Sequence, residues 1–146
     1  MHPNIRIGLA SDHAGFSFKQ DIMNWLAQQN LPARDFGCFS DESCDYADFA
    51  HPLAQTVAEG TIERGIVICG SGNGVAITAN KYRNVRCALV WEMELARLAR
   101  AHGDANVLAI PAKYVSLELA VAMADTFLST AFEGGRHQRR IDKIEQ

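Results

Sequence analysis

The stretch GIVICGSGNGVAITANK, residues 65–81, decides the expected fold of this 146-residue chain. A continuous apolar run ends at Cys69, and glycines then occupy the alternate positions 70, 72 and 74. Uninterrupted apolar runs are typical of strands in parallel sheets, because such strands are covered on both faces. The glycine-rich turn and the helical pattern over 74–81 complete one strand–turn–helix unit, which predicts an α/β protein.

The same alternation continues toward both ends of the chain. Apolar runs predict strands over 5–10, 33–36, 65–69, 87–90 and 107–110. Helical periodicity predicts helices over 16–26, 48–60, 74–81, 93–101 and 113–132, with Pro52 in the first turn of the second helix, and Gly134 and Gly135 end the last one. We therefore expect a single Rossmann-like domain over 1–146: a five-stranded parallel sheet in the flavodoxin-like order 2-1-3-4-5, with helices on both faces and a C-terminal helical tail.

The composition limits the classes of function. A hydrophobic content of 48% suffices for one compact core, and a net charge of −3 gives no general attraction to nucleic acid or anionic lipid. No apolar stretch approaches the ~20 residues of a membrane-spanning helix, and the N-terminus lacks the apolar region of a signal peptide, so we expect a soluble, cytoplasmic protein. The four cysteines form no CxxC pair, which argues against a structural metal site or a disulfide scaffold.

The expected topology brings two segments together at one edge of the sheet. Ligands of such folds bind at the carboxyl ends of the strands where the strand order reverses, here between strands one and three. Asp12 and His13 follow the first strand, so we expect them beside Cys69. The N–H groups of the glycine turn can hold anionic oxygens and stabilise the Cys69 thiolate. A base beside such a turn is suited to removing a proton from a carbon next to a carbonyl.

Simpler interpretations of these residues stay open. Cys69 could be a small buried hydrophobe, and Asp12 could be an ordinary helix cap. His102 closes a predicted helix, where a cation favours the helix dipole. Tyr46, at the end of a polar loop, could be a packed aromatic. The glycine turn is a poor dinucleotide fingerprint because it follows the third strand and lacks the final small residue, although Glu92, about 20 residues on, leaves nucleotide binding as an alternative.

Five segments together make a more specific prediction. They are ASDHAG at 10–15, DY at 45–46, GIVICGSGNGVAITANK at 65–81, AHGDANVLAI at 101–110 and EGGRHQRR at 133–140. In order and spacing they resemble the type B ribose 5-phosphate isomerase family, which also includes galactose 6-phosphate and allose 6-phosphate isomerases. The resemblance implies an aldose–ketose isomerase that needs neither cofactor nor metal and acts on a sugar phosphate through a cis-enediolate. It also implies a homodimer, or a dimer of dimers, whose subunits share active sites.

The resemblance implies a role for each matching residue. Cys69 would be the base that moves a proton between C1 and C2, and Ser71 would assist it. Asp12 and His102 would move hydroxyl protons during ring opening. The substrate-binding residues would lie in the glycine turn and around the phosphate: His13, Tyr46, Gly70, Gly72, Asn73, Gly74, Arg136 and Arg140.

The chain departs from the family pattern at two positions. Gly103 stands where the family usually has an asparagine after the histidine, and Ala47 stands where it usually has a proline. The missing amide leaves the choice of sugar open. It favours as alternatives an isomerase of tetrose or hexose phosphates, or a catalytically altered module that only binds a sugar phosphate or a nucleotide.

The position of the basic tail predicts how a dimer would form the site. The helix expected over 113–132 spans about 30 Å and starts at the carboxyl edge of the sheet. Its end, and with it Arg136 and Arg140, would then lie far from Cys69 of the same chain. We therefore expect a two-fold partner to supply these arginines.

Overall fold

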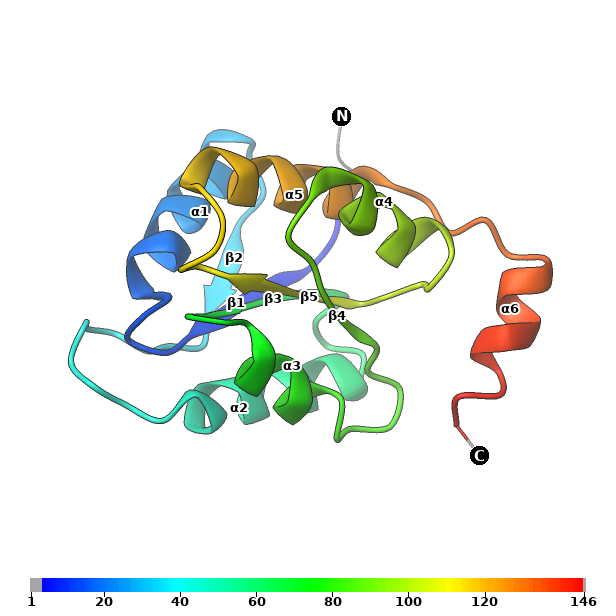
Figure 1. The fold of residues 1–146 in the computed structure, drawn as a ribbon, viewed down its shortest axis with the longest axis horizontal. Coiled ribbons are helices and arrows are strands. Elements are labelled where there is room, and N and C mark those ends of the chain that lie inside the picture. Colours follow the sequence, from blue (N-terminus) through cyan, green and yellow to red (C-terminus); the bar gives the residue numbers. More distant parts are fainter. Residues whose placement is uncertain (1–3, 146) are drawn as a thin grey trace.

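The computed structural model describes residues 4–145, and within them five strands and six helices form one layered α/β unit (Figure 1). The strands are β1 (Ile7–Ser11), β2 (Ala33–Asp35), β3 (Arg64–Cys69), β4 (Cys87–Leu89) and β5 (Val107–Pro111). The helices are α1 (Phe16–Gln28), α2 (Tyr46–Ala58), α3 (Asn73–Ala79), α4 (Met93–Ala101), α5 (Leu117–Ser129) and α6 (Arg136–Ile141). The ends of the expected domain, residues 1–3 and 146, lie outside the described residues. No helix within residues 4–145 is long and apolar enough to cross a membrane.

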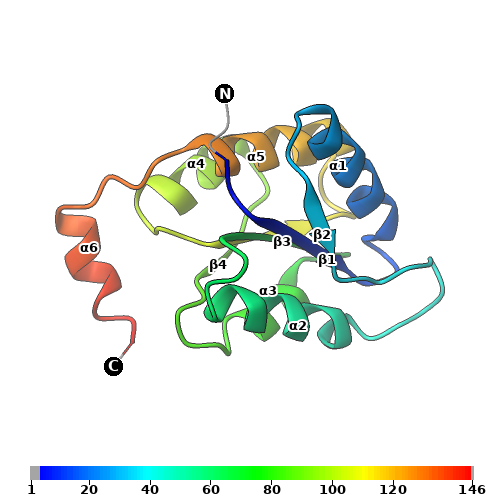
Figure 2. The same ribbon diagram turned by 180° about the vertical axis from the view of Figure 1, so that it is seen from behind.

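The sheet is parallel and carries helices on both faces, which confirms the predicted fold class. Helices α1, α4 and α5 cover one face, and α2 and α3 cover the other (Figures 1 and 2). The larger strand side chains, such as Leu9, Ile68 and Ile110, pack in the core under α1 and α5. The smaller ones, such as Ala10 and Val67, pack in the core under α2 and α3. Both cores hold the carboxyl ends of the central strands in place.

The strand order is β2-β1-β3-β5-β4, so the predicted order of the last two strands is wrong. Strand β5 lies between β3 and β4, and all five of its residues are buried. Strand β4 has three residues, all of them partly exposed. A long apolar strand belongs in the middle of a parallel sheet, and a short, less apolar strand belongs at its edge. The exchange leaves β1 and β3 as neighbours, so the predicted switch point is unaffected.

Two helices differ from their predicted bounds. Helix α2 begins at Tyr46, so Pro52 lies at its seventh position rather than in its first turn, and Tyr46 lies in a helix rather than in a loop. The proline is tolerated because it lies on the exposed side, where water can reach the carbonyl that its missing N–H would have bonded. Helix α5 covers Leu117–Ser129, shorter than the predicted 113–132, because the Ser116 hydroxyl accepts the Leu119 N–H at 3.1 Å and caps its start.

Candidate active site

The glycine turn joins β3 to α3 at the carboxyl edge of the sheet. Gly72 caps α3 in the left-handed conformation, with φ of 77°, which glycine adopts without strain. The Ser71 hydroxyl accepts the Asn73 N–H at 3.2 Å and so shapes the turn. A side chain at Gly74 would overlap the ring of Tyr46, so this glycine lets the aromatic ring lie against the turn. The structure thus brings Tyr46 to the turn that was predicted to bind substrate.

Asp12 and His13 lie beside this turn, as predicted. The Asp12 N–H donates to the Ile68 carbonyl at 3.2 Å, which places the end of β1 next to the end of β3. Asp12 is buried, and its Oδ1 accepts the Gly15 N–H at 3.0 Å. The His13 Nδ1 accepts the Cys44 N–H at 3.2 Å, so in the neutral ring the proton is on Nε2. His13 can therefore donate Nε2–H to an anionic oxygen.

Cys69 is the last residue of β3 and is 4% exposed. It packs in the core under α2 and α3, and it pairs in register with Pro111 of β5. Such burial is equally expected of a small core residue, so burial does not separate the two interpretations of Cys69. Its place directly before the glycine turn, next to Ile68, whose carbonyl accepts the Asp12 N–H, is what favours a chemical role.

Lys113 is a site residue that the sequence analysis missed. Its N–H donates to the Gly70 carbonyl at 3.0 Å, and a Cβ at position 70 would lie 3.2 Å from the Cδ of its side chain. The predicted helix over 113–132 hid it, although a lysine three residues after an expected strand stands at the same edge as the turn. An ammonium group here adds a positive charge where an anionic substrate would bind.

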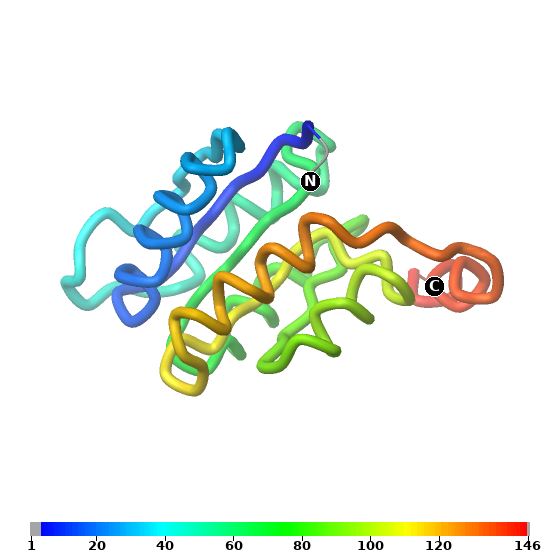
Figure 3. Tube along the Cα trace, turned by 90° about the horizontal axis from the view of Figure 1, so that it is seen from above, coloured from blue at the N-terminus to red at the C-terminus, as the bar shows by residue number. Residues whose placement is uncertain are grey.

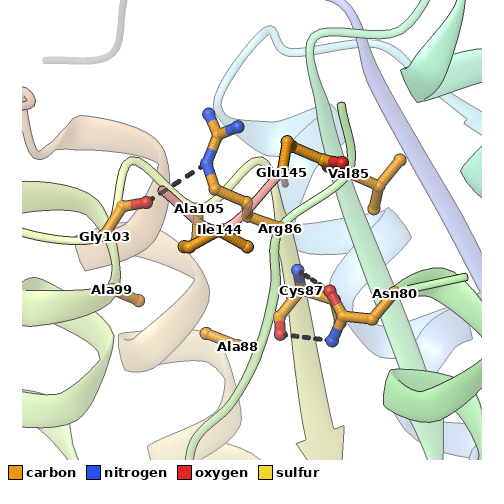
Figure 4. Close-up of a pocket in the computed structure, with 10 residues that line it drawn as sticks. All are labelled: Asn80, Val85, Arg86, Cys87, Ala88, Ala99, Gly103, Ala105, Ile144 and Glu145. Atoms are coloured by element: carbon orange, nitrogen blue, oxygen red, sulfur yellow. Dashed lines mark hydrogen bonds between the residues drawn. The ribbon is translucent and has the colours of Figure 1, made fainter. Parts of the chain in front are cut away.

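Three cavities lie near strands β4 and β5. One of about 320 Å³ begins at Ser71 and is lined by the exposed rings of Trp91 and Tyr114, so it adjoins the glycine turn. A larger one of about 460 Å³ is lined by Asn73, a predicted site residue, and by Leu89 of β4, so it also adjoins the turn. The third, of about 430 Å³, lies at the start of β4, where Asn80 holds the backbone of Cys87 through bonds of 2.8 and 2.9 Å (Figure 4). None of the described residues that line this third cavity is a predicted site residue.

Three predicted site residues, His102, Arg136 and Arg140, lie away from this edge. His102 caps the end of α4, five residues before β5 begins, whereas Cys69 pairs with the last residue of β5. Both arginines lie on α6, which stands at the opposite end of the molecule from the carboxyl ends of the strands (Figure 3). One chain therefore assembles the thiol, the glycine turn, Asp12 and His13 at one end, and it holds His102, Arg136 and Arg140 at another.

Side chains at this second location form their own cluster. The rings of His102 and His137 stack with centroids 4.0 Å apart. The Nε2 atoms of the two rings lie 3.5 and 3.7 Å from the same Glu133 carboxylate oxygen. The pKa of His137 is lowered first by burial and then by the neighbouring His102 and Arg136. Among the residues that the structure describes, His102, Glu133 and His137 form the one group of three side chains that are close enough together to hold a metal ion.

At Gly103 the backbone is closed to a side chain. A Cβ there would come within 2.9 Å of the Ala99 carbonyl oxygen, which is fixed in α4. The Gly103 carbonyl also accepts the Arg86 Nε–H at 3.3 Å. The asparagine that the family usually has here would therefore require the backbone to move. The departure noted in the sequence extends to the shape of the loop.

Comparisons with known proteins agree with the fold and with the expected family. The family model described as ribose/galactose isomerase matches residues 7–144. The ribose-5-phosphate isomerase B of Escherichia coli is 40% identical over 139 residues, which are 95% of this chain and 93% of that protein. A ribose 5-phosphate isomerase from Thermotoga maritima superposes with a TM-score of 0.95 at 44% identity, covering 98% of this chain and 99% of that one. The Mycoplasma genitalium ribose-5-phosphate isomerase B with bound ribulose-5-phosphate gives 0.93 at 42% identity, covering 98% and 95%.

These likenesses, together with the site at the switch point of the sheet, define a sugar-phosphate isomerase, an enzyme that interconverts aldoses and ketoses. The chain belongs to the ribose/galactose isomerase family. The family assignment drawn from the five sequence segments is confirmed.

Proposed function

We propose that the enzyme interconverts ribose 5-phosphate and ribulose 5-phosphate through a cis-enediolate, with Cys69 as the base. The observation that carries this proposal is the position of Cys69 at the end of β3, directly before the glycine turn and next to Ile68, whose carbonyl accepts the Asp12 N–H. The ribulose-5-phosphate in the Mycoplasma genitalium relative supports a five-carbon substrate.

The reaction follows from the order of groups along this edge. The Cys69 thiolate takes the proton from C2 of the open-chain aldose. The C2–H electron pair forms the C1–C2 double bond, and the π pair of the C1 carbonyl moves onto the C1 oxygen. The N–H groups at the start of α3, in the turn from Gly70 to Gly74, stabilise the resulting negative charge. The C2 hydroxyl proton moves to the C1 oxygen, and return of the Cys69 proton to C1 then gives the ketose with its carbonyl at C2. Ser71 assists the thiol, and Asp12 and His102 move the hydroxyl protons during ring opening.

A second copy of the chain would complete this site. We propose a homodimer in which His102, Arg136 and Arg140 of one subunit enter the pocket of the other, where the arginines and His13 bind the phosphate. The apolar side chains around the turn support this arrangement: Trp91 and Tyr114 are 54% and 77% exposed beside Ser71, and Ile77 is 62% exposed on α3. Strand β4 is also an open edge of the sheet. An isologous contact on this face would bury these groups and bring the second cluster to the first.

A proton-exchange assay in D2O tests the proposal. The enzyme should exchange the C2 proton of ribose 5-phosphate, and Cys69→Ala should abolish both exchange and isomerisation while binding the sugar phosphate about as well as the wild type. A panel of ribose, allose, galactose and four-carbon sugar phosphates, measured with the same protein, compares the possible substrates. Turnover near the wild-type rate in Cys69→Ala would contradict the role of the thiol. Faster turnover of a tetrose or hexose phosphate would replace ribose 5-phosphate as the substrate.

The alternative of a pure binding module is favoured only by Gly103. Under that alternative the protein would bind the same sugar phosphates without exchanging their C2 proton. Retention of Cys69, Ser71, Asp12 and His13 around one turn argues against it, because binding alone does not require a base.

A further inference from the structure

His102, Glu133 and His137 converge between the end of α4 and the start of α6, away from Cys69. One ligating atom from each of the three side chains lies within 4.8 Å of the other two. Two imidazoles and one carboxylate are a ligand set typical of sites for Zn²⁺ and similar divalent ions, whereas Mg²⁺ and Ca²⁺ prefer oxygen ligands only.

The distances in this cluster fit metal ligation better than hydrogen bonding. The Glu133 Oε1 lies 3.5 Å from the His102 Nε2 and 3.7 Å from the His137 Nε2. Hydrogen bonds between nitrogen and oxygen are about 2.7–3.2 Å long, so both separations exceed that range. Two ligand atoms bound tetrahedrally to Zn²⁺ at about 2.0–2.1 Å lie about 3.3–3.4 Å apart. Small movements would therefore suffice to form the site.

An independent observation concerns the Nε2 of His137. The His137 side chain is buried, and its Nε2 has no hydrogen-bond partner. Among the described residues, it is the one buried side-chain nitrogen or oxygen of which this is true. Buried polar atoms are normally satisfied, so an unpartnered one calls for an explanation. A bound cation would give this nitrogen the partner that it lacks.

We propose that His102, Glu133 and His137 bind a Zn²⁺ ion, which keeps a fourth position open to water. The buried His137 is the fixed ligand. The side chains of His102 and Glu133 are 40% and 50% exposed, so they can turn to meet the ion. The two rings are now only 12° from parallel, and the His102 ring has to tilt to aim its lone pair at the same point. Arg136 and Arg140 lie on the same helix as His137 and oppose a cation, so binding is weaker than at a four-ligand structural zinc site.

Metal binding here should inhibit the enzyme, and only this part of the proposal rests on the proposed function. A Zn²⁺ ion on the Nε2 of His102 withdraws that nitrogen from proton transfer. Zn²⁺ therefore acts as a reversible inhibitor of isomerisation that a chelator removes. The binding site itself depends only on the three side chains.

Titration of the full-length, chelator-treated protein with Co²⁺ and Zn²⁺ tests the site. The wild type should bind one ion per chain, with the visible Co²⁺ spectrum of nitrogen and oxygen ligands. Glu133→Gln and His137→Gln should each weaken binding at least tenfold. His51→Gln is the matched control, because His51 is a surface histidine paired with Tyr82 outside the cluster, and it should bind the ions as the wild type does. Since His137 is buried and its variant can lose its fold, the partly exposed Glu133 gives the second, independent test.

Three outcomes would overturn the metal site. They are no stoichiometric binding by the wild type, unchanged affinity in the folded Glu133→Gln variant, and a thiolate charge-transfer band that places Co²⁺ on a cysteine. Inhibition by Zn²⁺ is measured separately on the wild type, with and without EDTA. Stoichiometric binding without inhibition would confirm the site and contradict the role given to His102 in catalysis.

Discussion

At the residue scale, the cysteines differ in their surroundings. Cys87 is partly exposed at the edge strand, but its thiol is largely removed from water, and this desolvation raises its pKa to about 12. Burial, with the neighbouring Cys38, also raises the pKa of Cys44. Cys44 donates its backbone N–H to His13, so it lies at the proposed phosphate end of the site. Thiols whose pKa is raised are poor nucleophiles at neutral pH, because the thiolate is the reactive form.

Alkylation of Cys87 should therefore depend steeply on pH. With a pKa of about 12, its thiolate fraction is about 10⁻⁴ at pH 8 and rises about tenfold per pH unit. Iodoacetamide at pH 8 should leave Cys87 unmodified in the folded protein, and raising the pH to 10 should speed its reaction about 100-fold as long as the protein stays folded. Peptide mass spectrometry after timed quenching measures the rate, and the urea-unfolded chain is the control that reacts fast. Equal rates in the folded and unfolded chains at pH 8 would contradict the raised pKa.

The positions of single residues were predicted where one general rule decides them. Asp12 and His13 follow β1 and Cys69 ends β3, so the switch-point rule placed them at the same edge of the sheet. Lys113 was missed because apolar periodicity cannot distinguish the turn at 112–116 from the first turn of a helix. The backbone constraint at Gly103 could not be predicted either, since it depends on the carbonyl of Ala99 in the folded chain.

At the scale of elements, helix α6 arranges its charges by spacing. Arg136 and Arg140 are four residues apart and so share one face of the helix, while His137 and Ile141 are buried on another. The helix follows Gly134 and Gly135, both with positive φ, so the chain turns sharply after α5. Two guanidinium groups on one face can grip a phosphate through charge-assisted hydrogen bonds.

Removal of both guanidinium groups should weaken binding of the phosphorylated substrate. Each hydrogen bond to a charged group contributes about 1.5–3 kcal/mol, so Arg136→Ala/Arg140→Ala should raise KM at least about tenfold and lower kcat less. Arg139→Ala is the control, because it removes one guanidinium group from a neighbouring face of α6; the single variants Arg136→Ala and Arg140→Ala each remove one charge and match it. Steady-state kinetics over a range of sugar-phosphate concentrations measure both constants. An unchanged KM in the double variant would show that these arginines do not bind the phosphate.

Elements were predicted reliably as strands or helices, and less reliably in order and extent. Strands β4 and β5 both appear as short apolar runs in the sequence. Only the burial of β5 on both faces shows that β5 lies nearer the centre of the sheet than β4. The start of α2 was missed because Asp45 caps it without a side-chain hydrogen bond and because Pro52 was taken as a first-turn residue. Both errors concern how segments pack, which local sequence does not encode.

At the scale of the whole molecule, the two groups of predicted site residues lie at opposite ends of the folded domain. Cys69 and the glycine turn lie at the carboxyl ends of the strands. His102 caps the end of α4, and the arginines lie on α6, which stands at the opposite end of the molecule (Figures 1 and 3). In the proposed dimer each pocket takes one group from each subunit.

Subunit exchange between two inactive variants tests this arrangement. Cys69→Ala and Arg136→Ala/Arg140→Ala protein, mixed in equal amounts, should regain about a quarter of wild-type activity. Half of the randomly paired dimers are mixed, and each mixed dimer has one pocket with both lesions and one intact pocket. Each variant alone, taken through the same exchange, is the control, and mass spectrometry of tagged chains verifies that the subunits exchange. If mixed dimers form and no activity returns, each chain supplies its own phosphate-binding arginines.

The separation of the two groups of site residues within one chain also bears on how duplicated genes can diverge. In a shared pocket, one copy of the chain could lose its thiol and its paralogue could lose its arginines, and their heteromer would keep one working site. Each copy would then be free to change the end it no longer uses, and the pair would become mutually dependent. A fold that held all these residues at one end would not allow such a division of labour, because either loss would inactivate the chain that suffered it.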